Sequence, residues 1–243
     1  MLKLMTFNIR NGGAGDGANA WRFRRELVAE TVRQQNPDIL GFQEVLHHQL
    51  LELARDLPDY DHVGVAREDG RCEGEFAPIF FRSSLQARGT ETFWLSETPE
   101  VVGSQSWNTA CTRVCTVLRL DGFAVFNCHL DHISQEARTK GLRLIASRAQ
   151  EPAIIMGDFN VPEGDEALAE LSHHVDTYRA IHPDGPEPVT YQGFNAELRL
   201  GEKIDYIFVS PGIRILDAAV IQQDFSGRAA SDHFAVVATI EVP

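Results

Sequence analysis

Alternating apolar and polar stretches divide the chain into predicted helices and strands. Over 21–35, apolar residues recur at a spacing near 3.6 and the pattern ends at Asn36 and Pro37, which predicts an amphipathic helix. Further helices are predicted at 47–57, 134–147 and 166–171. Short apolar runs predict strands at 2–9, 38–42, 60–65, 77–82, 85–93, 112–120, 123–129, 153–156, 206–209, 213–222 and 234–242.

The order of these elements indicates the fold class. Asp121 and Gly122 separate two alternating apolar runs, and an Asp-Gly pair in this position predicts an antiparallel hairpin. Helices that lie between groups of strands indicate an α/β (α+β) fold, in which two mixed sheets pack face to face with helices outside. The length of 243 residues suits a single domain that spans 1–243.

Composition and charge narrow the class of protein. Apolar residues make up 43% of the chain and charged residues 23%, which fits a globular rather than a disordered protein. The formal net charge of −13 gives little affinity for a long polyanion and weighs against a processive nuclease. No apolar run reaches the roughly 18 residues of a membrane span. No signal-peptide pattern opens the chain either, so we expect a cytoplasmic protein without a membrane partner.

The cysteines are too few and too irregularly spaced for a disulfide framework, which fits a reducing compartment. Cys111 and Cys115 have a spacing that could belong to a zinc site, but no second Cys/His pair completes it. Core thiols are therefore the preferred interpretation.

Polar side chains with catalytic potential gather where predicted strands begin or end. They are Asn8, Gln43, Glu44, His129, Asp131, His132, Asp158, Asn160, Asp205, Asp232 and His233. Any single one of them is more often a helix cap, a solvated strand end or a packed histidine than a functional group. Together they supply hard oxygen ligands for Mg²⁺ or Mn²⁺, an imidazole base and amides that hold an anion.

The sequence also resembles the endonuclease/exonuclease/phosphatase superfamily with the DNase I-like fold, over almost the whole chain. Seven motifs stand in the order of that family: Phe7-Asn8-Ile9-Arg10, Gln43-Glu44, Glu75 before Ile79-Phe80-Phe81-Arg82, Asn127-Cys128-His129-Leu130-Asp131, Gly157-Asp158-Phe159-Asn160, Ile204-Asp205-Tyr206-Ile207 and Ser231-Asp232-His233. The resemblance implies a four-layer α/β/β/α sandwich and a hydrolase that cleaves phosphate esters with a divalent metal.

The resemblance also implies a metal site and a group that activates water. Glu44 would be the main carboxylate ligand of Mg²⁺ or Mn²⁺, with Asn8 and Asp232 nearby. Asp205 would pair with His233 and raise its basicity. Either Asp158 or His233 would be the base. The preferred interpretation gives His233 the role of base or phosphate ligand, and Asp158 the positioning of water.

The remaining positions carried over from the family would bind phosphate. Asn160 would hold a phosphate oxygen, and His129 would contact the phosphate while Glu75 orients its ring. Arg113 resembles a phosphate-neutralising position, although a surface cation is an equal alternative. Asp131 is expected to contact substrate or, equally, to hydrogen-bond a neighbouring residue.

The substrate class is left open by the sequence, because one catalytic centre serves many substrates in this superfamily. Within it the chain looks like a bacterial branch near the deadenylase-type exonucleases, marked by the segments 93–99 and 129–132. The acidic charge and the lack of a basic stripe favour a short single-stranded nucleic acid, a nucleotide or a small sugar or inositol phosphate over duplex DNA. Four aromatic residues are candidates for stacking on a base, with core packing the alternative for each: Phe76, Trp94, Trp107 and Phe194. The competing hypothesis is a catalytically inactive binding module of the same fold. No prediction of oligomeric state follows from the sequence.

Overall fold

A computed structural model describes residues 1–150, 152–194, 201–223 and 225–243. The strands are β1 (Leu2–Asn8), β2 (Ile39–Gln43), β3 (Tyr60–Val63), β4 (Ile79–Arg82), β5 (Gly89–Trp94), β6 (Val114–Leu120), β7 (Phe123–His129), β8 (Ala153–Asp158), β9 (Val175–Asp176), β10 (Asp205–Val209), β11 (Arg214–Ile221) and β12 (Ala235–Glu241). The helices are α1 (Trp21–Gln35), α2 (His47–Asp56), α3 (Gln135–Arg148) and α4 (Thr177–Ile181), and two 3-10 segments, η1 (Gly17–Asn19) and η2 (Glu166–Leu171), complete the elements.

The strands form two mixed six-stranded sheets. The first has the order β11-β12-β1-β2-β4-β3 and the second β5-β6-β7-β8-β10-β9. Each sheet holds one parallel pair, β1 with β2 and β7 with β8, among antiparallel neighbours. The strand residues alternate between the two faces of each sheet, and both faces carry apolar side chains, so each sheet needs a covering layer on either side.

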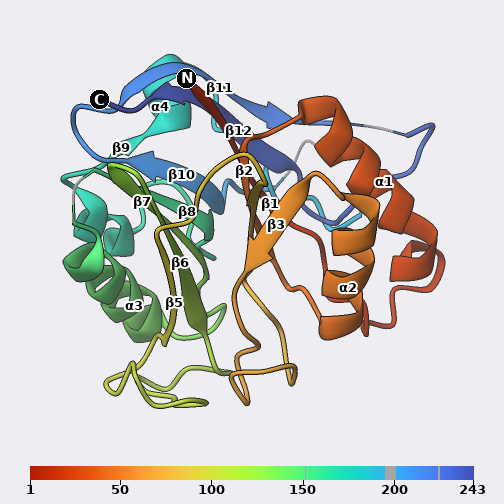
Figure 1. Ribbon diagram of the computed structural model, residues 1–243, viewed down its shortest axis with the longest axis horizontal. Helices are drawn as coiled ribbons and strands as arrows, with labels where there is room; N and C mark the ends of the chain where they lie inside the picture. The colour runs from red at the N-terminus through yellow and green to blue at the C-terminus, as the bar shows by residue number, and fades with distance from the viewer. Residues whose placement is uncertain (151, 195–200, 224) are drawn as a thin grey trace.

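Three apolar clusters hold the layers together. Side chains of both sheets, among them Ile39, Val125 and Ile207, form the central cluster between the sheets. A second cluster joins the first sheet to α1 and α2, and a third joins the second sheet to α3. Figure 1 shows α1 and α2 on one side of the paired sheets and α3 on the other. The predicted four-layer α/β/β/α sandwich is therefore confirmed.

Most predicted elements coincide with observed ones to within a few residues. The Asp121-Gly122 hairpin is confirmed, because β6 and β7 pair up to Leu120 and Phe123 on either side of the turn. The pattern missed β9 and α4, which are too short to show a period of either kind. The predicted strand 112–120 begins only at Val114, because Arg113 and the residues before it form a loop that reaches toward the site.

One buried amide ties the two sheets together beneath the functional site. Asn127 on β7 donates to the carbonyls of Phe42 (2.8 Å) and Pro78 (2.9 Å), and its Oδ1 accepts from Gln43 Nε2 (2.6 Å). A buried polar network in which every bond crosses between layers fixes the relative position of the sheets more tightly than apolar packing alone. None of the helices in the described ranges is long and apolar enough to cross a membrane.

Candidate active site

A cavity of about 750 Å³ opens at the edge where the strands of both sheets end. It is lined by both acidic and basic side chains: Arg10, Asn11, Gly13, Ala14, Glu44, Arg67, Glu75, Cys111, Arg113, His129, His132, Asp158, Asn160, Tyr191, Glu202, Ile204, Asp232 and His233. Most of the predicted site residues are among them, so the structure brings together side chains that lie more than 200 positions apart in the sequence.

Strand register explains why these residues meet. His129 and Asp158 end the parallel strands β7 and β8 opposite one another, and Asp205 begins the antiparallel β10 opposite Asp158. Gly157 precedes Asp158 with φ of 147°, and a Cβ there would lie 2.0 Å from the carbonyl oxygen of Cys128. Only glycine lets β8 run this close to β7 at that point. The backbone thus requires glycine immediately before Asp158.

Asp158 lies at the centre of the site. Its Oδ2 accepts a hydrogen bond from Asn8 Nδ2 (2.9 Å) and lies 3.5 Å from His129 Nε2 and 3.8 Å from His233 Nε2. The residue is almost fully buried. Burial first, and then repulsion from Asp205, raise the pKa of the Asp158 carboxyl above its usual range. A carboxylate whose pKa is raised in this way is suited to accept a proton near neutral pH.

Asp205 and His233 form the pair that the resemblance implies. His233 Nδ1 and Asp205 Oδ2 are 2.9 Å apart, and both residues are buried. Burial alone would lower the pKa of His233, but the charge of Asp205 and its hydrogen bond outweigh that effect and raise the pKa to about 10. The imidazole therefore holds its proton at neutral pH and presents Nε2 as a donor toward the cavity.

The acidic side of the cavity offers hard oxygen donors. Glu44 accepts from Asn8 Nδ2 (3.1 Å) and from the backbone N–H of Asn11 (2.8 Å). The guanidinium of Arg10 lies 3.9 Å from the Glu44 carboxylate and 3.7 Å from that of Asp232, so both carboxylates face the same cation. Asp158, Asp205 and His233 form a second group, whose ligand atoms all lie within 4.8 Å of one another. Carboxylate oxygens clustered in this way fit Mg²⁺ or Mn²⁺.

Asn8 is oriented differently from a metal ligand in this arrangement. Its amide nitrogen points at the carboxylates of Glu44 and Asp158, while its oxygen accepts from the backbone N–H of Arg10 (3.0 Å). The amide thus holds two carboxylates of like charge near one another. Asn8 therefore lies beside the carboxylates of Glu44 and Asp158, and its place in a metal site stays a prediction.

The opposite wall of the cavity is basic. Arg113 is buried, which rules out the alternative of a surface cation, and its Nη2 lies 3.1 Å from His132 Nδ1. Burial, followed by repulsion from Arg113, lowers the pKa of His129, so this imidazole is neutral. Among the described residues, Arg113 Nε and His129 Nδ1 have no hydrogen-bond partner. Unpartnered polar atoms in the wall of a cavity indicate a site for an anion or water.

The predicted pairing of Glu75 with His129 is contradicted. Glu75 accepts from Asn11 Nδ2 (2.7 Å) and forms an ion pair with Arg67, while no described residue occupies His129 Nδ1. Glu75 lies on the cavity wall, but its carboxylate holds the loop at Asn11 and the side chain of Arg67 in place instead of the imidazole. The orientation of His129 comes from β7 and from Asp158.

Asp131 was predicted either to contact substrate or to hydrogen-bond a neighbouring residue, and the structure shows the hydrogen bonds. Its carboxylate accepts four hydrogen bonds, from Thr109 Oγ1 (2.7 Å) and the backbone N–H groups of Ala110 (2.8 Å), Ile133 (2.9 Å) and Ser134 (2.7 Å). Asp131 does not line the cavity. It fastens the loop before β6 to the loop after β7, and in this way it positions their neighbours Arg113 and His132.

Replacing Asp131 with asparagine is expected to destabilise the fold by about 1–3 kcal/mol, because an amide offers one acceptor oxygen and turns its NH₂ toward N–H donors. Burial would raise the pKa of Asp131, but the hydrogen bonds, that of Ser134 first, lower it to about 2. The ionised Asp131 carboxylate therefore stabilises the fold fully above about pH 4, the pKa of aspartate in the unfolded chain. This stabilisation is lost as the pH falls toward about 2. Urea unfolding gives the free energy of unfolding of wild type and variant across this pH range. The difference between the two should become smaller in acid. Asp184→Asn, at an exposed position, is the control.

Three arginines and one aromatic residue at or next to the cavity were not predicted as site residues. Arg10 and Arg67 line the cavity. Arg24 is buried and donates to the carbonyls of Ile9, Asn19 (2.8 Å), Arg10 (2.9 Å) and Ala230 (3.3 Å), so it fixes the loops that carry Arg10 and Asp232. The signal for Arg24 was present in the sequence, because it lies on the apolar face of the predicted helix, three residues after Trp21 and four before Val28.

The predicted aromatic candidates do not line the cavity. Phe76 and Trp94 are buried in apolar clusters, and Trp107 and Phe194 are partly buried outside the lining residues. Tyr191 takes their place: it is 44% exposed, lines the cavity and packs against His233 with ring centroids 5.0 Å apart. Its ring offers a flat surface beside His233.

Comparison with known proteins agrees with this geometry. The family model described as endonuclease/exonuclease/phosphatase family matches residues 5–233. A solved endonuclease/exonuclease/phosphatase from Bacteroides vulgatus is 31% identical, with a TM-score of 0.91, and the match covers 100% of this chain and 99% of that one. A mannosyl-6-phosphatase from Bacteroides thetaiotaomicron is also 31% identical, with a TM-score of 0.91, over 99% of this chain and 100% of the other.

A more distant structure shares the fold alone. The catalytic domain of human Nocturnin with a bound sulfate anion is 19% identical, with a TM-score of 0.73, and the match covers 99% of this chain and 93% of that domain. At this level of identity the likeness shows a common architecture and says nothing of a common substrate.

Proposed function

We propose that this chain, which belongs to the endonuclease/exonuclease/phosphatase family, hydrolyses a phosphate ester by in-line attack of water with the help of Mg²⁺ or Mn²⁺. Members of this family are hydrolases that act on phosphoester bonds. The observation that carries the proposal is the environment of Asp158: a buried carboxylate with a raised pKa, within 4 Å of two imidazoles, in a cavity that has acidic and basic walls.

The acidic wall is the proposed metal site. Glu44 and Asp232 would hold the ion, with Asn8 beside them, and the ion when bound would polarise the phosphoryl oxygens and stabilise charge on the leaving oxygen. Arg10 already bridges the two carboxylates, at 3.9 and 3.7 Å. The positive charge of Arg10 reduces the repulsion between the Glu44 and Asp232 carboxylates and keeps them close together. It does so in place of a metal or next to one.

Asp158 is the proposed acceptor of the water proton. Its raised pKa and its position between Asn8 and the two histidines favour it over His233 as the base, because His233 already carries a proton beside Asp205. The Nε2–H of His233 would donate to a phosphate oxygen in the transition state. The proposal thus gives the role of base to Asp158, whereas the sequence alone favoured His233.

The basic wall is the proposed phosphate-binding site. Among the described residues, Arg113 Nε and His129 Nδ1 have no partner, and both residues line the cavity together with Asn160. Asn160 is fixed in the left-handed region, with φ of 51°, by the bond from its N–H to Asp158 Oδ1 (2.9 Å) and from its Nδ2 to the carbonyl of Leu130 (3.0 Å). These donors would bind the non-bridging oxygens before and during attack.

The substrate class we propose is a small phosphate monoester such as a sugar phosphate. The chain is similar over its full length to a mannosyl-6-phosphatase. Its net charge of −13 opposes the approach of a long polyanion. The exposed ring of Tyr191 beside His233 would pack against the apolar face of a sugar. The same ring could stack on a nucleobase, which keeps nucleotides and short single-stranded nucleic acids among the candidates.

Release of inorganic phosphate and of nucleotides from a substrate panel tests the proposal. Sugar 6-phosphates, nucleotides, short single-stranded DNA and RNA, and bis-p-nitrophenyl phosphate would each be offered with Mg²⁺, with Mn²⁺ and with a chelator. We expect metal-dependent cleavage of sugar phosphates in preference to the diesters. Preferred cleavage of oligonucleotides would refute the substrate class, and binding of phosphate esters without cleavage would indicate an inactive binding module.

Replacing Arg113 with alanine is expected to raise KM for a phosphate monoester by about 10- to 100-fold, since a hydrogen bond to a charged group contributes about 1.5–3 kcal/mol. The side chain is buried at the cavity wall, and its Nε has no partner among the residues that the structure describes. Initial rates against substrate concentration give the change. Arg119→Ala, at an exposed position of the adjoining strand β6, is the matched control, and an equal rise of KM in both variants would contradict the assignment.

A further inference from the structure

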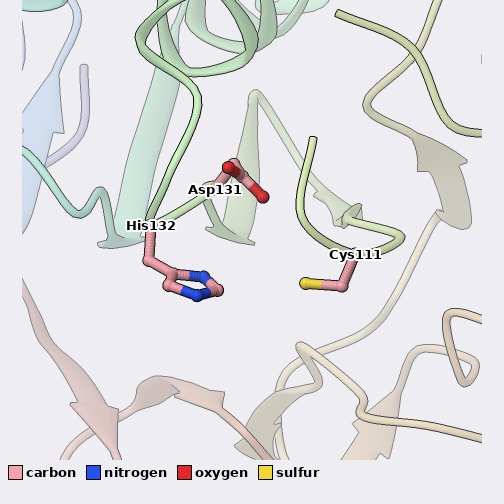
Figure 2. A group of neighbouring side chains, drawn as sticks. All are labelled: Cys111, Asp131 and His132. Carbon is pink, nitrogen blue, oxygen red and sulfur yellow. The ribbon is translucent and has the colours of Figure 1, made fainter. Parts of the chain in front are cut away.

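Three potential ligands for a second kind of metal meet at the rim of the cavity. Cys111, Asp131 and His132 each offer one ligand atom, and these atoms lie within 4.8 Å of one another. Figure 2 shows the thiol, the carboxylate and the imidazole turned toward a common space from two separate loops. Cys111 and His132 line the cavity, and Asp131 is buried behind them.

We propose that this group binds Zn²⁺ or another soft divalent ion, and that the bound ion inhibits the enzyme. A thiolate together with an imidazole selects zinc and related transition metals, whereas Mg²⁺ prefers the oxygen-only donors on the opposite wall. The two sites therefore differ in the chemistry of their ligands. A fourth position would stay open to the cavity, because His132 is exposed on that side.

The ligands are held in place before any ion arrives. The Asp131 carboxylate bonds to Thr109 and Ala110, next to Cys111, and to Ile133 and Ser134, just beyond His132. One buried side chain thus ties together the two loops that carry the other ligands. A carboxylate has about four acceptor positions, and these four bonds fill them, so a bond to zinc requires one of them, such as that from Thr109, to give way.

Distance and charge are both compatible with zinc. Zinc bonds of about 2.0–2.3 Å place tetrahedral ligand atoms roughly 3.5 Å apart, so atoms that lie up to 4.8 Å apart would move closer together on binding. The thiolate and the carboxylate together balance the charge of the ion. A thiol loses its proton when it binds zinc, so binding would release one proton to solvent.

Zinc at this position would interfere with the basic wall. Arg113 Nη2 lies 3.1 Å from His132 Nδ1, so an ion on that nitrogen would displace the guanidinium. Inhibition by zinc rests on the proposed function, which assigns phosphate binding to Arg113. Zinc binding itself does not rest on it.

Cobalt spectroscopy of the intact protein tests the site. With Mg²⁺ present in excess to fill the oxygen site, added Co²⁺ should produce the thiolate-to-cobalt charge-transfer absorption in the wild type. Cys111→Ser should abolish the band, and His132→Gln should weaken Zn²⁺ affinity at least about 10-fold in competition with a chromophoric chelator. Cys72→Ser, at an exposed cysteine elsewhere, is the control. A band that survives in Cys111→Ser, or no band in the wild type, would overturn the site.

The inhibitory role has a separate readout. At saturating Mg²⁺, Zn²⁺ should slow phosphate release by the wild type, and the concentration needed should rise at least about 10-fold in Cys111→Ser. Equal sensitivity of both proteins would overturn the inhibitory role. A protein without any hydrolase activity would refute the proposed function, and the cobalt spectrum would still decide whether the zinc site exists.

Discussion

Asp158→Asn is expected to lower kcat by about 10²- to 10⁴-fold, the range that a positioned general base contributes. The asparagine keeps the shape of the side chain but cannot accept a proton from water. KM should change little, because the proposed interaction acts in the transition state. Steady-state rates of phosphate release with saturating Mg²⁺ measure both constants.

The same substitution should leave the fold intact or make it more stable. Burial first, and then repulsion from Asp205, raise the pKa of Asp158, so a neutral side chain removes an unfavourable buried charge. Thermal unfolding separates loss of activity from loss of structure. Asp217→Asn, on the exposed face of β11, controls for the removal of one negative charge. A kcat of Asp158→Asn close to that of the control would remove Asp158 from the mechanism.

Glu44→Gln is expected to raise the Mg²⁺ concentration needed for half-maximal activity by at least about 10- to 100-fold, the loss typical of residues that only support metal ligands. Glu44 is the proposed main carboxylate of the metal site, and the amide that replaces it has no charge and a single acceptor oxygen. Rates measured over a Mg²⁺ titration give the shift.

Excess Mg²⁺ distinguishes this variant from Asp158→Asn. Activity of Glu44→Gln should recover in part at high Mg²⁺, whereas that of Asp158→Asn should not. Glu136→Gln, on the exposed surface of α3, is the matched control. An unchanged Mg²⁺ requirement in Glu44→Gln would place the metal elsewhere in the cavity, with the group of Asp158, Asp205 and His233 as the next candidate.

Much of the fold could be predicted from the sequence, because its long elements carry clear periods. The helix at 21–35 coincides with α1, and the Asp121-Gly122 turn separates β6 from β7 as expected. The short elements β9 and α4 could not be predicted, since two and five residues show no periodicity. The place of Asn127 between the sheets depends on tertiary contacts that no local pattern encodes.

Positions of site residues were easier to predict than their partners. Strand register places Asp158 opposite Asp205, and the segment before β12 brings His233 within 2.9 Å of Asp205. Side-chain pairing depends on the tertiary positions of competing partners, which the sequence does not give. Glu75 bonds to Arg67 and Asn11, and His129 Nδ1 has no partner among the described residues. The buried arginine Arg24 went unrecognised because a guanidinium is normally assigned to the surface, although its helical position indicated the core.

The most direct test of the central claim is phosphate release from a sugar 6-phosphate as a function of Mg²⁺ concentration, measured in parallel for the wild type, Glu44→Gln and Asp158→Asn. The account predicts that wild-type activity saturates with Mg²⁺ and vanishes with a chelator, that Glu44→Gln needs far more Mg²⁺, and that Asp158→Asn stays slow at every concentration. Chelator-resistant activity, or equal activity of all three proteins, would contradict a metal-dependent phosphoesterase in this cavity.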